Sequence, residues 1–144
     1  MVYSMVRVNL VNPKALSDQH LIAEYNEILM LAAYIRKYPE TDNIPERYRL
    51  GRGHMRFFKN KVLYLKERHE NIKVEMRKRG FKTSKTIDLN TFEKGNKHRW
   101  KPECRDIVQV RRRIVSRLKL KPDYYRYCGE YKPVGFFVNL LKRY

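Results

Sequence analysis

The sequence predicts an all-α protein with three main helices, irregular loops and an aromatic C-terminal segment, packed into a single compact domain over residues 1–144. Three observations predict this class. Apolar residues recur at spacings of three and four along three long segments, which is the period of a helix face. The sequence shows no β-hairpin signal and no internal repeat. With 144 residues, 42% of them hydrophobic, the chain can bury one core without disulfides or metals.

The first helix is expected over residues 13–38. Pro13 suits a first helical turn, whereas Ser17 followed by Asp18 suits an N-terminal cap, so the start is predicted at one of these two points. Pro39 ends the helix because proline cannot continue the hydrogen-bond ladder. One face of the helix is apolar and consists of Leu21, Tyr25, Ile28, Ala32 and Ile35.

The strongest helical pattern covers residues 54–79 and predicts one continuous helix, about 39 Å long. Gly80 follows as a natural helix terminator. The positions expected to face the core alternate spacings of three and four and are Met55, Phe58, Val62, Leu65, His69, Ile72 and Met76.

A third helix is expected from Pro102 to about Leu118, after a polar and irregular segment over residues 81–101. Residues 119–133 then mix aromatic and basic side chains. Residues 134–144 are expected to form a C-terminal tail with a final helical turn or two. The inward face of the third helix is expected to consist of Ile107, Val110, Ile114 and Leu118.

Positive charge is concentrated in the C-terminal two thirds of the chain. Residues 1–50 hold six basic and six acidic side chains, whereas residues 51–144 hold 27 basic and nine acidic ones, so this part carries the whole net charge of +18. The basic part also has helical periodicity, so charge and fold share the same helices. A polyanionic partner follows, with nucleic acid as the first candidate and an anionic membrane surface or a ribosome as alternatives.

Several protein classes are excluded by composition. The sequence has no run of roughly 18 apolar residues that would span a membrane, and no apolar N-terminal stretch typical of a signal peptide. Two cysteines are too few for a disulfide scaffold. Without a His-Glu-x-x-His motif or a cysteine pair, no metal site is predicted. We expect a cytoplasmic, nucleoid-associated protein without a cofactor, with a monomer as the default.

Two segments in the N-terminal half of the sequence contain candidate site residues. His20, Glu24 and Glu27 are four and three residues apart, so they share one helix face, which is either a solvated stripe or an acid–base site. The glycines of residues 51–53 precede a long helical pattern. Free backbone N–H groups there would bind phosphate, with Arg52 and His54 contacting DNA; a plain turn that starts a helix is the alternative.

Two further candidates lie in the basic part. Arg113 and Arg117 are four residues apart on one helix face, where like charges repel by a few tenths of a kcal/mol unless a phosphate bridges them. Tyr124, Tyr125 and Arg126 interleave aromatic rings with charge, which suits stacking on unpaired bases. The alternative for the tyrosines is that they seal the core.

Three sequence blocks occur in a characteristic order. Residues 5–27 contain Met-Val-Arg-Val-Asn-Leu, Leu-Ser-Asp-Gln-His-Leu and Ala-Glu-Tyr-Asn-Glu; residues 50–58 read Leu-Gly-Arg-Gly-His-Met-Arg-Phe-Phe, followed by Lys-Arg-Gly-Phe at 78–81; residues 121–129 read Lys-Pro-Asp-Tyr-Tyr-Arg-Tyr-Cys-Gly. Together they resemble the pyrimidine-dimer DNA glycosylases of the phage endonuclease V type. The resemblance implies a compact helical enzyme that acts on damaged double-stranded DNA without a metal or cofactor.

The resemblance also implies a two-step reaction. The first step cuts the 5′ glycosyl bond of a cyclobutane pyrimidine dimer, and the second breaks the strand by β-elimination. The nucleophile is then the α-amino group of Val6, provided that translation starts at Met5 or that the first five residues are removed; otherwise the nucleophile lies elsewhere. A start at Met5 is the favoured interpretation, with residues 1–4 as an extension. An α-amino group suits this role because its pKa is near 8, and cationic neighbours such as Arg7 lower it further.

The remaining roles follow from the same resemblance. Glu27 matches the catalytic glutamate, which stabilises positive charge at the sugar and shuttles protons. Residues expected to contact DNA or line the active site are Arg7, His20, Arg113 and Arg117. Residues expected to support the pocket are Gln19, Glu24, Tyr25 and Asn26.

The sequence departs from the phage enzyme at four positions. Asn26 and Met30 stand where that enzyme carries arginines, Val6 replaces a threonine and Tyr124 replaces a tryptophan. Because the two arginines near the catalytic glutamate are absent from this sequence, two hypotheses other than dimer repair stay open. One is a related glycosylase and lyase with a different preferred lesion. The other is a non-catalytic basic protein that binds nucleic acid.

Overall fold

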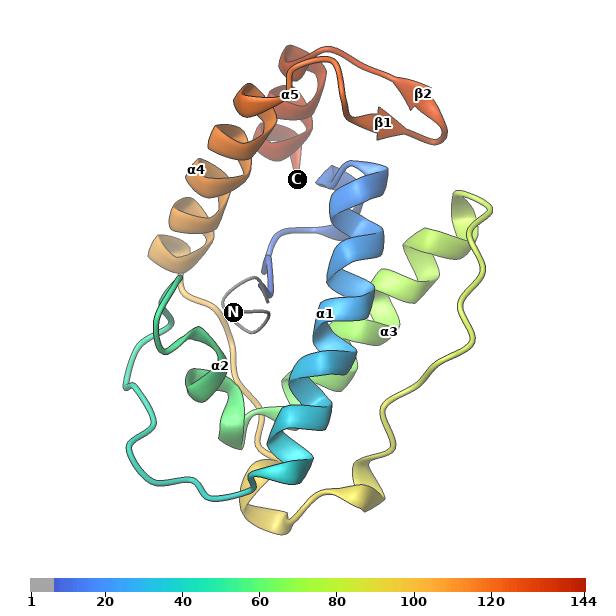
Figure 1. Cartoon of the computed structure of the whole chain (residues 1–144). Helices are drawn as coiled ribbons and strands as arrows, with labels where there is room; N and C mark the ends of the chain where they lie inside the picture. Colours follow the sequence, from blue (N-terminus) through green and yellow to red (C-terminus); the bar gives the residue numbers. More distant parts are fainter. Residues whose placement is uncertain (1–6) are drawn as a thin grey trace.

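The computed structural model describes residues 7–144 and confirms the predicted all-α class (Figure 1). Five α-helices and one small hairpin are joined by loops and short 3-10 turns. Within the described part of the chain, no helix combines the length and apolar character needed to cross a bilayer. The elements are α1 (Asp18–Lys37), α2 (His54–Phe57), α3 (Val62–Lys78), α4 (Cys104–Leu120), β1 (Arg126–Tyr127), β2 (Glu130–Tyr131) and α5 (Val134–Arg143).

Helix α1 packs against α3 at the centre of the molecule (Figure 1). Its N-terminus is capped by Ser17, whose side chain accepts the amide N–H of His20 at 3.1 Å. The second of the two predicted starts is therefore the observed one, and Pro13 lies in a separate 3-10 turn, Pro13–Ala15. All five residues of the predicted apolar face are buried.

The prediction of one continuous helix over residues 54–79 is wrong. A 3-10 turn, Phe58–Asn60, and a non-helical Lys61 separate α2 from α3. The Lys61 ammonium donates to the carbonyl of Phe57 at 2.9 Å, and the carbonyl of Asn60 accepts the amide of His98 at 3.0 Å. Both carbonyls thus accept a donor other than a backbone N–H of the helix. The core register survives the break, since the predicted inward positions from Phe58 to Met76 are all buried.

The C-terminal region is more ordered than the sequence predicted. The expected tail is the ten-residue helix α5, which packs on α4 and on the turn Pro13–Ala15 and buries Phe137 and Leu141. Strands β1 and β2 form an antiparallel hairpin that the sequence analysis did not predict. Its two turn residues, Cys128 and Gly129, both have positive φ, +52° and +82°. Such turns match the twist of the strands they join.

A buried ion pair joins α1, α3 and the N-terminal segment. The carboxylate of Glu24 accepts Arg68 Nε at 2.7 Å and Arg68 Nη2 at 3.0 Å. The remaining guanidinium nitrogen, Nη1, donates to the carbonyl of Val11. Both side chains are buried, so each charge depends on the other for compensation.

Removal of one partner should therefore be costly. We expect Glu24→Ala to lower the free energy of unfolding by about 3–5 kcal/mol, because it leaves the Arg68 charge buried and unpaired. Glu67→Ala is the matched control, because Glu67 pairs with Arg99 at 3.4 Å where both side chains are exposed. Its effect should stay below about 1 kcal/mol. Urea denaturation measures both values, and equal losses would contradict the role given to the buried pair.

Candidate active site

Residues 7–17, which precede α1 and are called the N-terminal segment below, are fixed by hydrogen bonds to the backbone of Val8. Its N–H donates to His54 Nε2 at 2.9 Å, and its carbonyl accepts the hydroxyl of Tyr48 at 2.9 Å. His54 Nδ1 in turn donates to the carbonyl of Arg49 at 2.8 Å, so Nε2 is the acceptor nitrogen. Burial lowers the pKa of His54 to about 4, which keeps the ring neutral. Tyr48 and His54 thus form a clamp around Val8.

Glu27 lies beside the start of this segment. One of its carboxylate oxygens accepts the amide N–H of Arg7 at 3.2 Å. Burial is the largest effect on its pKa, which rises to about 7 even though this hydrogen bond and the nearby guanidinium of Arg113 act in the opposite direction. At neutral pH, both the protonated and the ionised form of a carboxyl group with this pKa are populated, so the group can donate and accept protons.

His20 lies on the same face of α1 as Glu27, and an aromatic ring covers one side of its imidazole. It stacks on Tyr125 with ring centroids 4.7 Å apart. Burial, followed by the charges of Arg113 and Arg117, lowers its pKa to about 4, so the imidazole is neutral. Its Nδ1 is buried and receives no hydrogen bond from the described residues.

Three cations lie near Glu27 and His20, with Arg113 acting on both, a second arginine acting on Glu27 and a third acting on His20. Arg7 comes from the N-terminal segment, and Arg113 and Arg117 come from one face of α4, as their spacing predicted. Burial and the neighbouring charges of Arg7 and Arg117 lower the pKa of Arg113, which shows how closely these groups are placed. Within residues 7–144, neither Arg113 nor Arg117 forms an ion pair with a carboxylate. The arrangement is typical of a site for a polyanion.

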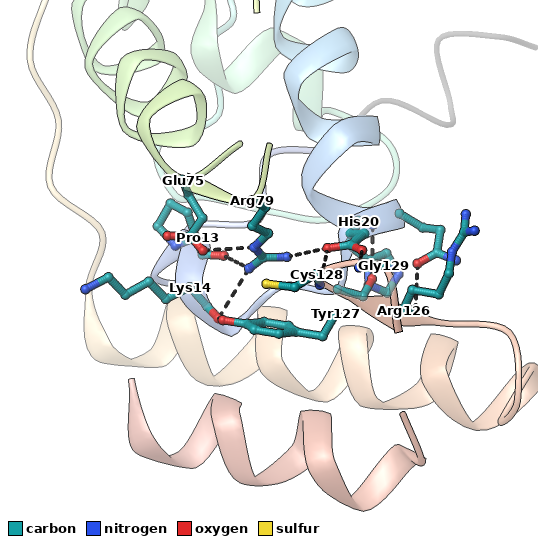
Figure 2. Close-up of polar contacts among 12 residues, drawn as sticks. Pro13, Lys14, His20, Glu75, Arg79, Arg126, Tyr127, Cys128 and Gly129 are labelled. Atoms are coloured by element: carbon teal, nitrogen blue, oxygen red, sulfur yellow. Dashed lines mark hydrogen bonds and ion pairs between the residues drawn. The ribbon is translucent and has the colours of Figure 1, made fainter. Parts of the chain in front are cut away.

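The start of α1 holds the C-terminal hairpin in place (Figure 2). Asp18 accepts three donors: the backbone N–H groups of Cys128 at 3.0 Å and Gly129 at 2.8 Å, and Arg79 Nη1 at 3.0 Å. Arg79 also lies 4.1 Å from the ring centroid of Tyr127. We call this set of contacts the hairpin latch.

Gln19 adds a second pair of bonds to the same segment. Its Nε2 donates to the carbonyl of Tyr124 at 2.8 Å, and its Oε1 accepts the amide of Arg126 at 3.0 Å. Tyr125, between these two residues, is thereby held over His20. Gln19 therefore supports the site by positioning a backbone segment.

Residues predicted to bind DNA fall into two groups. Tyr124 is 49% exposed, and the side chains of Arg126 and Arg52 are also exposed, so all three are accessible to a ligand. His54 and Tyr125 are buried, and both ring nitrogens of His54 are engaged in the clamp. Neither ring is accessible to DNA in this conformation.

The glycines before α2 are explained by local structure. Gly53 has a φ of +89°, and a Cβ there would lie 2.8 Å from Arg49 Cδ, so the backbone conformation favours glycine and a larger residue would displace the Arg49 side chain. Helix α2 has four residues, too few for a strong dipole at its N-terminus. The simpler interpretation, a turn that starts a helix, therefore accounts for this segment.

The predicted pocket supports do not all lie together. Glu24 is engaged by Arg68 behind the site. Tyr25 faces away from Glu27, stacks on His69 and accepts the amides of Ser84 and Lys85 through its hydroxyl. It holds the loop after α3.

Asn26 is exposed on the outer face of α1 and donates to the carbonyl of Ile22 at 3.2 Å. Met30, one turn further along, is also exposed. This face of α1 is therefore uncharged beside Glu27.

The structure thus brings together Arg7, His20, Glu27, Arg113 and Arg117. Val6, the predicted nucleophile, lies outside the described residues. Two grooves, of about 580 and 530 Å³, lie elsewhere on the surface and include neither Glu27 nor His20. An open cluster of this kind suits a macromolecular ligand that itself covers the reacting groups.

Sequence analysis did not assign Tyr48 or Arg79 to the site. Tyr48 lies in the irregular loop between α1 and α2. Arg79 is the residue that directly follows α3. No spacing rule links these residues to Val8 or Asp18, because the contacts join segments far apart in the chain.

Comparison with protein families gives one direct indication of identity. The family model described as pyrimidine dimer DNA glycosylase matches residues 5–89, which is more than half of the chain. The matched range contains His20, Glu27 and the clamp residues Tyr48 and His54. Helix α4 and the hairpin lie beyond it.

The hairpin latch predicts a local effect on stability. We expect Asp18→Asn to lower the free energy of unfolding by about 1–3 kcal/mol, because an amide cannot accept all three donors. Trypsin should also cleave faster after Arg126, since the freed hairpin opens more often. Asp123→Asn is the matched control, because Asp123 is exposed and forms no ion pair among the described residues. Equal cleavage rates in the two variants would show that Asp18 does not hold the hairpin.

Proposed function

The chain belongs to the pyrimidine dimer DNA glycosylase family, and from that premise we propose that it excises cyclobutane dimers through an imine with an N-terminal amine and then nicks the strand by β-elimination. DNA containing pyrimidine dimers is the substrate that the family implies. The observation that carries the proposal is the 3.2 Å hydrogen bond from the amide of Arg7 to Glu27. It connects the catalytic carboxylate to the beginning of the N-terminal segment.

We propose the α-amino group of Val6 as the nucleophile. Covalent geometry keeps an amine within about 4 Å of the next amide nitrogen, so this group would act beside Glu27. The clamp around Val8 limits the movement of the segment, which is the positioning that a nucleophile needs. Nearby guanidinium groups favour the neutral, nucleophilic form of the amine.

In the glycosylase step, the lone pair of the amine forms a bond to C1′ of the damaged nucleotide. The bond between C1′ and the pyrimidine nitrogen breaks, and the base leaves with that electron pair. Protonated Glu27 donates a proton to the sugar ring oxygen as the bond from C1′ to that oxygen breaks. The amine loses one proton to the departing base, and the C1′ imine forms in its protonated state. A carboxyl pKa of about 7 supplies this proton near neutral pH.

In the lyase step, the imine acidifies the C2′ proton. Ionised Glu27 accepts that proton, a double bond forms between C2′ and C3′, and the C3′–O bond breaks. The 3′ phosphate leaves with the electron pair of that bond. Arg113 and Arg117 would stabilise the departing phosphate, a role supported by their lack of carboxylate partners among the described residues.

DNA binding would rest on the same cations and on the exposed residues of the C-terminal segment. Opening a duplex at a damaged pair costs a few kcal/mol, which is less than at an intact pair. Tyr124 and Arg126 are accessible to an unstacked base or its phosphate. The uncharged outer face at Asn26 and Met30 favours a second candidate, the same chemistry with a different preferred lesion.

Borohydride trapping tests the nucleophile directly. Protein that begins at Val6 should form a covalent adduct with duplex containing an abasic site or a dimer, because borohydride reduces the imine to a stable amine. Mass spectrometry should map the adduct to Val6. Protein that retains residues 1–5 should give no adduct, because its Val6 nitrogen is an amide. An adduct on a lysine in both proteins would remove Val6 from the mechanism.

The clamp provides a matched pair of variants for this experiment. Tyr48→Phe removes the hydroxyl that binds the carbonyl of Val8, whereas Tyr64→Phe changes a neighbouring aromatic residue that makes no such bond. We expect Tyr48→Phe to slow trapping about tenfold at unchanged DNA affinity, since a misplaced nucleophile loses rate rather than binding. Equal rates in the two variants would show that the clamp does not position the amine.

Glu27→Gln should abolish activity and stabilise the protein. Strand cleavage should fall by at least about 100-fold, with DNA binding retained, because the proton shuttle is lost. At pH 8 the free energy of unfolding should rise by about 1–2 kcal/mol, less than the whole pKa shift implies because solvent screens a half-buried carboxylate. Full cleavage activity would exclude Glu27 from the reaction.

The sign of this effect follows from the pKa of Glu27, which rises from 4.5 to about 7 on folding. The folded protein therefore holds a proton that the unfolded chain releases in this interval. The stability that Glu27 contributes is present below pH 4.5 and is lost as the pH rises through 7, so the gain in Glu27→Gln should shrink towards pH 4.5. Glu70→Gln is the control and should not raise the free energy of unfolding, because Lys73 holds the pKa of Glu70 below its usual range.

A further inference from the structure

A groove between α4 and α5 lies outside the site already described. Its volume is about 530 Å³, and its floor is aliphatic. Val108 and Val115 come from α4, and Val138 and Leu141 come from α5. Val108 is 41% exposed and adds to the apolar surface of this groove. The groove thus offers apolar surface that residues 7–144 leave uncovered.

Cations surround this floor. Arg111, Arg112 and Lys142 line the groove together with Ser116, and no carboxylate does. The Nε of Arg111 is buried and has no hydrogen-bond partner in the described structure. A buried guanidinium N–H normally has an acceptor, and a carboxylate is the strongest one available in proteins.

The groove and the active site use opposite sides of α4. Successive residues of an α-helix are about 100° apart, so Arg111 projects about 160° away from Arg113. Arg113 faces Glu27 and His20, whereas Arg111 faces the groove. DNA bound at the active site would therefore leave the groove open.

The combination of floor and rim selects one kind of occupant. DNA phosphates would satisfy the cations but would leave the aliphatic floor exposed. A second copy of this chain would be repelled by a net charge of +18 on each molecule. An amphipathic helix with aliphatic residues on one face and carboxylates beside them would satisfy both surfaces.

We propose that this groove docks an acidic amphipathic helix of a protein partner while DNA occupies the active site. Aliphatic side chains of the partner would cover Val108 and Val115, and its carboxylates would pair with Arg111 and Arg112. The proposal does not depend on the lyase mechanism, because it concerns a different face of α4.

The test uses the full chain and a fluorescein-labelled peptide of about 18 residues, with leucine on one helical face and glutamate on the other. Fluorescence anisotropy measures its affinity at physiological salt. A scrambled peptide of the same composition should bind about tenfold more weakly. A saturating amount of DNA duplex should leave binding of the amphipathic peptide unchanged within about twofold. Equal binding of both peptides, or full displacement by DNA, would overturn the proposal.

Variants locate the binding surface. Val108→Glu should weaken binding about tenfold, whereas Val74→Glu, which adds the same charge at an exposed valine on α3, should change it less than about twofold. Arg112→Ala and Lys119→Ala form a second matched pair, because both residues are exposed on α4 but only Arg112 lines the groove. Equal effects within either pair would show that binding reflects net charge alone, which overturns the proposal.

Discussion

The buried ion pair between Glu24 and Arg68 is the interaction on which the rest of the structure depends. It joins the two central helices, and through the carbonyl of Val11 it also fixes the segment that leads to the candidate site. Such a pair contributes little net stability by itself, because desolvation offsets the attraction. It does impose one register of α1 on α3, and that register determines which side of α1 presents His20 and Glu27.

Several charged groups of the candidate site lie where burial and neighbouring charges disfavour their charged forms. Glu27 is partly desolvated, and the guanidinium groups of Arg7 and Arg113 lie near it. Each of these groups would be better solvated in the unfolded chain. The fold tolerates the cost because the clamp and the latch fix the surrounding backbone independently of the charges. Unfavourable placement of this kind is typical of residues retained for function.

The predictable part of the structure is the part encoded by local periodicity. The buried face of α1, the inward positions of α3 and α4 and the shared face of Arg113 and Arg117 follow from helical spacing. The break at Lys61 does not, because it depends on the Lys61 ammonium, which binds the carbonyl of Phe57, and on the distant amide of His98, which binds the carbonyl of Asn60. The hairpin turn at Cys128 lacks the usual Asn-Gly or Asp-Gly signal, and the bonds of Asp18 and Tyr48 join segments more than 30 residues apart.

The hairpin latch has a consequence for synthesis of the protein. Asp18 and Gln19 stand near the beginning of the chain, but their partners are residues 124–129, near its end. A ribosome therefore releases α1 long before the residues that complete its surroundings. Arg113 and Arg117 also emerge late. A nascent chain that stalls before residue 124 carries Glu27 but lacks the ring over His20, so the candidate site would be complete only after residues 124–129 have been made.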